Sequence, residues 1–223
     1  MKVLIQCAAT KDTRAGCMRT IDGRRVKFVA HPPPKGEGGG GYLLVHPDDH
    51  SNNGQTWRAR VLAYNQNREV NPFGLLPAYR LYSNPVYQAL ADGFGIRNIF
   101  ILSAGWGLIP ADFLTPDYDI TFSGIADGIK RRKTSDNFND WSMIESNSSD
   151  PLLFLGGKSY FRLFCELTER YQGARIALYN STVVASHCPG IKRVRYVTKT
   201  RTNWHYEAAR ALLDGKIDLS GYL

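Results

Sequence analysis

Long apolar segments are absent from this sequence of 223 residues. No uninterrupted apolar run approaches the roughly 18 residues that a membrane-spanning helix needs, so we expect no membrane partner. The opening residues, MKVLIQC, are too few for the apolar core of a secretory signal and are typical of a buried strand. We therefore expect a soluble cytoplasmic protein, and the sequence leaves its oligomeric state open.

Cysteine is also scarce. The sequence holds four cysteines, Cys7, Cys17, Cys165 and Cys188, with no C-x-x-C pair among them. Because this spacing fits no zinc motif and an intracellular compartment keeps thiols reduced, we predict neither a disulfide nor a structural zinc. His46 and His50 in HPDDH come nearest to a metal-binding pair, but the breakers around them place them in a loop. We predict no metal and no other cofactor.

Acidic residues are missing from residues 171–206, which nevertheless contain six Lys or Arg residues. Most of the net charge of +8 therefore lies in this segment. Such a concentration of positive charge favours a polyanionic partner, most simply nucleic acid, and an ordinary solvated basic surface is the alternative. The residues that we expect to contact the DNA backbone, reading charge and not sequence, are Arg131, Arg132, Lys192, Arg193, Arg195, Lys199 and Arg201.

The remaining composition is that of a globular protein. Hydrophobic residues make up 43% and charged residues 22% of the chain, which excludes a disordered, fibrous or repeat protein. This length favours one domain covering 1–223. Breakers in HPPPKGEGGGG and DDHSNNG bracket one strand-like piece, so we expect an inserted, flexible excursion at 31–54.

Strand-like and helix-like segments alternate along the chain. Apolar or alternating runs predict strands at 2–7, 57–64, 98–103, 151–155, 175–179 and 194–197. Helices are predicted from about Pro85, over 159–171 and over 204–213. The alternation predicts an α/β fold with a central, mostly parallel sheet flanked by helices.

A glycine turn follows the predicted strand at 151–155. Its GGKS sequence is not a P-loop, because that motif needs a glycine five positions before Gly157 and Leu152 stands there. The start of the next helix still offers backbone N–H groups and Lys158 to an anion. An ordinary turn with a solvent-exposed lysine is the alternative.

Two motifs follow the predicted strand at 98–103. The first is the Ser-Ala-x-Trp-Gly-Leu turn of Ser103 to Leu108, and the second is the Pro-Asp-Tyr-Asp element of Pro116 to Asp119. With the first loop (Cys7, Ala9, Thr10, Lys11), LYSNPVYQAL and LGGKSYF, they make the chain resemble the YaaA-like superfamily. The resemblance touches four blocks across 3–160, and residues 14–70 are longer than the family pattern.

The superfamily joins DNA-binding stress proteins, domains of unknown function, and relatives of uracil-DNA glycosylases and tRNA-guanine transglycosylases. Some of its members act in phage defence and are similar to glycosylases that excise modified cytosine. The resemblance implies a nucleobase pocket at the strand ends. It also implies double-stranded DNA as the partner, with phage DNA carrying modified bases as the sharpest version.

The central loop supplies carboxylates for such chemistry. Hydrolysis of an N-glycosidic bond passes through an oxocarbenium-like sugar cation, which a carboxylate can stabilise while it orients the attacking water. Asp119 is the first candidate and Asp117 the second. Residues two apart in an extended segment point the same way, so we expect both carboxylates to be able to face the pocket. A turn or capping role is the alternative for either aspartate.

Other residues are predicted to hold the substrate. A base extruded from a duplex is gripped by stacking and by hydrogen bonds to its edge, so Trp106 and Tyr118 are candidates for stacking. Burial in the core is their alternative role. The predicted polar contacts to base or phosphate are Thr10, Lys11, Ser103, Lys158, Asn180 and His187, with His205 as a weaker candidate.

These observations lead to one principal hypothesis and two alternatives. The principal hypothesis is a DNA glycosylase that extrudes and excises a nucleobase, in its sharpest version a modified base in anti-phage defence. The first alternative is a non-enzymatic DNA-binding protein of the stress-response kind. The second is a tRNA base-exchanging enzyme, which would need a carboxylate nucleophile and an RNA partner.

Overall fold

The computed structural model describes residues 1–36, 38–181, 188–198, 200 and 202–222. Its largest element there is a seven-stranded sheet in the order β12-β11-β10-β1-β5-β6-β9. These strands are β1 (Lys2–Gln6), β5 (Ile99–Ser103), β6 (Gly107–Pro110), β9 (Trp141–Ser142), β10 (Leu152–Leu155), β11 (Arg175–Tyr179) and β12 (Ile191–Arg195). Five of its six strand pairings are parallel, and β5 with β6 is antiparallel. The predicted α/β fold with a mostly parallel sheet is confirmed.

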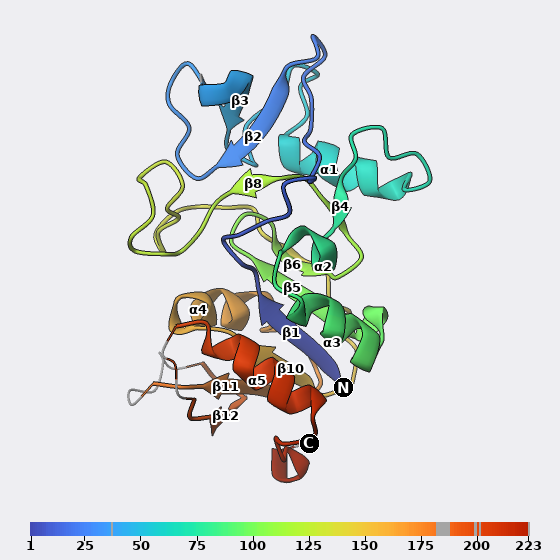
Figure 1. The fold of residues 1–223 in the computed structure, drawn as a ribbon, viewed down its shortest axis with the longest axis vertical. Helices are drawn as coiled ribbons and strands as arrows, with labels where there is room; N and C mark the ends of the chain where they lie inside the picture. Colours follow the sequence, from blue (N-terminus) through green and yellow to red (C-terminus); the bar gives the residue numbers. More distant parts are fainter. Residues whose placement is uncertain (37, 182–187, 199, 201, 223) are drawn as a thin grey trace.

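Helices cover this sheet. The helices α3 (Val86–Phe94) and α5 (Trp204–Leu213) pack against each other and cross the front of the sheet in Figure 1. The helix α4 (Lys158–Leu167) joins β10 to β11 in the opposite direction along the sheet, so a right-handed crossover places it on the other face. Burial on both faces explains why β1, β5 and β10 are continuous apolar runs.

A second layer stands beyond the carboxyl end of β1 (Figure 1). It contains a parallel sheet in the order β3-β2-β8 and an antiparallel β4-β7 pair. Its strands are β2 (Arg25–Val29), β3 (Tyr42–Val45), β4 (Leu76–Pro77), β7 (Leu114–Thr115) and β8 (Tyr118–Asp119), and its helices are α1 (Trp57–Gln66) and α2 (Ala78–Leu81). Short 3₁₀ turns are η1 (Gly39–Gly41), η2 (Ile96–Asn98) and η3 (Ser220–Tyr222).

The excursion at 31–54 contributes to this layer. Its strand β3 pairs with β2 in parallel, from Arg25 opposite Tyr42 to Phe28 opposite Val45. Asp48 then joins the excursion to later residues, because its carboxylate accepts hydrogen bonds from the Arg58 side chain and from the backbone N–H of Asn139.

The prediction of a strand at 57–64 is wrong, because these residues form the start of α1. Thr56 caps this helix by accepting a hydrogen bond from the backbone N–H of Ala59. The buried positions include Trp57, Val61 and Asn65, which recur at helical spacing. Alternation in WRARVLAY was misleading because Arg58, expected to face solvent, is buried as well.

The prediction that the protein has no disulfide is also wrong. Cys165 in α4 is bonded to Cys188, which lies shortly before β12, and their Cα atoms are 6.1 Å apart. Packing brings together two residues separated by 23 positions, a contact that motif spacing does not reveal. Cys7 and Cys17 are free thiols. Within the described residues, no helix has the length and apolar character to span a membrane.

Candidate functional site

The candidate site lies at the carboxyl ends of β1, β5 and β10. From β1 the chain goes to β5 on one side, and it later returns to β10 on the other side before continuing to β11. The boundary between β1 and β10 is therefore a topological switch point, where open α/β sheets bind their ligands. Gln6 at the end of β1 accepts a hydrogen bond from the backbone N–H of Gly157 at 2.6 Å, which holds the start of α4 there.

A buried polar network fills this end of the sheet. The Ser103 hydroxyl donates to the Tyr118 hydroxyl at 2.9 Å, and the Tyr118 and Tyr82 hydroxyls are 2.8 Å apart. On the β10 side, the Cys7 sulfur lies 3.1 Å from the Tyr160 hydroxyl. Desolvation raises the pKa of all three tyrosines well above the usual range. The network therefore consists of neutral phenols held in fixed positions.

Lys11 lies over this network from the first loop. Its Nζ is 4.2 Å from the centre of the Tyr118 ring, and its backbone forms a bridge with Tyr82. Burial lowers the pKa of Lys11, while the charges of Asp117 and Asp119 act in the opposite direction. Lys11 is thus an amine whose pKa lies below that of an exposed lysine.

The two predicted carboxylates flank Tyr118, with Asp117 immediately before β8 and Asp119 within it. Asp117 pairs with Lys27 at 3.1 Å, and Asp119 pairs with Lys130 at 2.8 Å. Their side chains are 23% and 33% exposed, whereas Tyr118 points into the core. The structure therefore brings Lys11 and Ser103 together at Tyr118, and Asp117 and Asp119 are the chain neighbours of Tyr118.

Neither residue predicted to stack on a base offers an open ring face. Trp106 is fully buried, stacked on Trp141 with ring centres 5.6 Å apart and touched edge-on by Phe28. Tyr118 is 1% exposed and has Lys11 over its ring. Both are core residues, which was their alternative role. The turn that carries Trp106 is fixed by Gly107, whose φ of 86° and contact with the Trp141 backbone leave no space for a Cβ.

Other predicted substrate contacts are spread along the same edge. Thr10 and Lys158 are exposed, and Lys158 begins α4. The Asn180 side chain joins the loop after β11 to the loop after β12. Its Nδ2 donates to the Thr198 hydroxyl at 2.6 Å, and its Oδ1 accepts a hydrogen bond from the Thr198 backbone N–H. His187 lies outside the described residues. His205 is buried in α5, where desolvation lowers its pKa to about 4.

The predicted DNA-backbone residues divide into three groups. Arg131 and Arg195 are exposed, and Arg195 lies at the carboxyl end of β12, the last strand of the sheet. Lys192 donates to the Tyr222 carbonyl, and the Arg193 guanidinium lies over the Phe161 ring of α4. The remaining residues are Arg132, which is buried, and Lys199 and Arg201, which lie outside the described residues.

Arg132 is buried, so it offers no exposed guanidinium to a DNA strand that lies on the protein surface. Its guanidinium donates to the Ala104 carbonyl at 2.7 Å and forms a two-pronged ion pair with Asp140. It also lies over the Phe138 ring at 3.8 Å. Burial raises the pKa of Asp140, although the hydrogen bonds from Arg132 act in the opposite direction. In the KRRK run the sequence gives no sign that this one arginine points inward.

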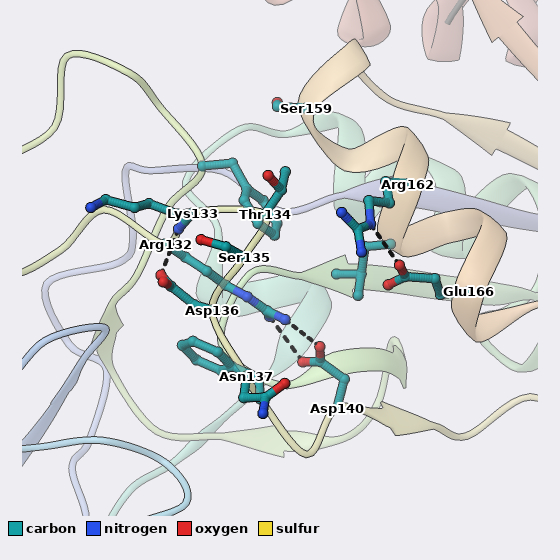
Figure 2. Close-up of a pocket in the computed structure, with 13 residues that line it drawn as sticks. Arg132, Lys133, Thr134, Ser135, Asp136, Asn137, Asp140, Ser159, Arg162 and Glu166 are labelled. Atoms are coloured by element: carbon teal, nitrogen blue, oxygen red, sulfur yellow. Dashed lines mark hydrogen bonds and ion pairs between the residues drawn. The ribbon is translucent and has the colours of Figure 1, made fainter. Parts of the chain in front are cut away.

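Sequence reasoning missed a pocket beside Arg132. It has a volume of about 300 Å³ and is lined mainly by Phe122, residues 132–138, Asp140, and Ser159, Arg162 and Glu166 of α4. Figure 2 shows the Arg132 side chain extended toward Asp140, with Arg162 and Glu166 on the helix facing it. No local motif predicts the pocket, because its two walls come from segments about twenty residues apart.

Two contacts connect the lining of the pocket to the polar network. The backbone N–H of Ala104 points to the Cys7 sulfur at 3.4 Å, whereas its carbonyl accepts from Arg132. Phe122 lines the pocket, and its ring packs edge-on against the Tyr160 ring at 5.0 Å. A ligand in the pocket would therefore lie next to the network at the strand ends.

The described residues contain no group of three or more His, Cys, Asp or Glu side chains placed to hold a metal ion. The arrangement instead offers an amine, two carboxylates and a polar pocket. No protein-family model, curated protein or solved structure matches this chain. The relationship to the YaaA-like superfamily therefore stays a prediction.

Proposed function

We propose that this protein is a DNA glycosylase that extrudes a nucleobase from a duplex and hydrolyses its N-glycosidic bond. The observation that carries the proposal is the position of the Lys11 ammonium over the Tyr118 ring, with Asp117 and Asp119 on either side of Tyr118 in the chain. Together they offer both groups that the reaction needs: a carboxylate for the sugar and a proton donor for the base.

In the proposed reaction the bond between C1′ and the base nitrogen breaks, and its electron pair leaves with the base. Lys11, whose pKa is lowered by burial, gives its proton to that base. Asp119 stabilises the positive charge that develops on the sugar, and it accepts a proton from the water that attacks C1′. Asp117, two residues before Asp119 and immediately before β8, is the second candidate for this role.

The lysines that pair with the two carboxylates fit a nucleic-acid substrate. Lys27 and Lys130 are each about one-third exposed, so their ammonium groups can also reach the phosphates flanking an extruded nucleotide. A phosphate that attracts the Lys130 ammonium would leave the Asp119 carboxylate available to the sugar. Exposed Arg131 and Arg195 add positive charge for the strand outside the site.

The experiment is a base-release assay on duplex oligonucleotides carrying unmodified or modified bases, with abasic sites detected by alkaline cleavage. We expect wild type to act on at least one duplex and Asp119→Asn to lower the rate by roughly 100-fold or more, the scale of a lost acid–base group. Asp112→Asn is the matched control, because Asp112 pairs with Arg68 away from Lys11. If no duplex loses a base, the proposal fails.

A non-enzymatic DNA-binding protein is the second candidate. The observation that favours it is that lysines already neutralise both carboxylates. Duplex affinity that persists in Asp119→Asn, measured at a stated salt concentration, together with no base release by wild type, would establish this alternative.

A further inference from the structure

We propose that the pocket between residues 132–138 and α4 binds a phosphoryl group. Its walls combine a buried guanidinium, the first turn of a helix and several free hydroxyls. The inference deepens the proposed function by giving the DNA strand a fixed phosphate position, and the identification of that phosphate with DNA rests on the proposed function. A free nucleotide carries the same phosphoryl chemistry.

The first observation is an unpartnered donor. Arg132 is 6% exposed, and both of its terminal nitrogens are engaged by Ala104 and Asp140. Its Nε has no hydrogen-bond partner within the described residues, although it is buried. A buried N–H without an acceptor is costly, so an acceptor entering the pocket that Arg132 lines would gain a charge-assisted hydrogen bond.

The second observation concerns the carboxylates in the pocket wall, which all have donors already. Asp140 accepts from Arg132, and Glu166 accepts from Arg162 at 2.7 Å. Asp136 accepts the backbone N–H of Lys133 at 2.7 Å. The three carboxylates are therefore matched in number by Arg132, Lys133 and Arg162, so the lining has no excess of negative charge.

The donors that remain are several. The hydroxyl-bearing residues Thr134, Ser135 and Ser159 line the pocket, and their hydroxyls have no partner among the described residues. Lys133 lines it too, with its side chain extending away from α4 in Figure 2. Ser159 lies in the first turn of α4, a ten-residue helix whose N-terminal N–H groups receive no side-chain cap. A ligand rich in hydrogen-bond acceptors therefore fits these donors, and phosphate is such a ligand.

The test is isothermal titration calorimetry at fixed ionic strength with three probes: inorganic phosphate, thymidine 5′-monophosphate and an unmodified DNA duplex. The pocket variants are Lys133→Glu and Arg162→Glu. Their matched controls are Lys35→Glu and Arg170→Glu, exposed residues outside the pocket lining with the same change of charge. Thermal melting of each variant verifies that it is folded.

We expect each pocket variant to weaken binding of at least one probe about tenfold or more relative to its control, the scale of a lost charge-assisted contact. If the pocket variants weaken binding of the nucleotide but not of the duplex, the natural ligand is a free nucleotide. If they weaken binding of the duplex alone, the ligand is a phosphate of the DNA strand. Equal losses in pocket variants and controls, or no binding of any probe, would overturn the inference.

A second measurement reports on Arg132 itself. The ¹H–¹⁵N signal of its Nε–H, assigned by its loss in Arg132→Lys, should move downfield when inorganic phosphate or the nucleotide binds. A signal that stays unchanged at saturation would count against the site. If the protein releases a base but neither measurement detects a ligand in the pocket, the phosphate site fails and the glycosylase proposal survives. If phosphate binds but no base is released, the phosphate site survives and the glycosylase proposal fails.

Discussion

The buried ion pair between Arg132 and Asp140 supports a large and testable stability prediction. The two side chains are 6% and 7% exposed, so Asp140→Asn removes a charge from the interior while keeping its size and leaves the guanidinium without a counter-charge. Loss of one partner of a buried pair costs about 3–5 kcal/mol. In a protein of this length that corresponds to a melting temperature lower by roughly 6–20 °C.

The matched control is Asp112→Asn. Asp112 forms an ion pair with Arg68 in which the side chains are 46% and 44% exposed, and such surface pairs contribute about 0–1 kcal/mol. Urea unfolding followed by tryptophan fluorescence gives both free energies, since Trp106 and Trp141 pack close to this part of the core. If the free energies of unfolding of the two variants differ by less than about 1 kcal/mol, Arg132 and Asp140 do not form a buried ion pair.

Three further outcomes can be measured. Burial lowers the pKa of His205 to about 4, so as the pH falls below the usual pKa of 6.5 the unfolded state takes up a proton that the folded state does not, and the folded state loses stability. About 2 kcal/mol of the free energy of unfolding should be lost between pH 7.5 and pH 5. His205→Gln should remove this part of the loss in urea titrations. The Cys165–Cys188 bond should leave two reactive thiols in denatured, unreduced protein, where four would contradict it, and reduction should cost about 3 kcal/mol. Tyr118→Phe removes the acceptor of the buried Ser103 hydroxyl and should lower the free energy of unfolding by about 1–2 kcal/mol; a change near zero would contradict the network.

Much of the fold follows from local sequence patterns. The strands β1, β5 and β10 are predictable because burial on both faces of a parallel sheet demands short apolar runs. The helix α1 is not predictable in the same way, because Arg58 occupies a buried position that its partners outside the helix, Asp48 and the carbonyls of Gly105 and Trp106, make acceptable. Periodicity assigns such a residue to solvent and shifts the apparent repeat from helix to strand.

The candidate site is only partly predictable for related reasons. The position of Lys11 over Tyr118 follows from the rule that loops at the carboxyl ends of parallel strands converge. The inward direction of Arg132 and the pairing of Cys165 with Cys188 depend on tertiary packing between segments that carry no shared motif. For Trp106 the residue type does not decide the role, because an aromatic side chain in such a motif can be buried in the core as readily as it can face a ligand, and Trp106 is buried.

The most direct test of the central claim is mass spectrometry of free bases released from phage genomic DNAs that differ in base modification. Wild type should release a base from at least one genome, Asp112→Asn should retain that activity, and Asp119→Asn should lose it while remaining folded. Release of no base by wild type, or equal release by Asp119→Asn and wild type, would contradict the assignment of glycosylase chemistry to this site.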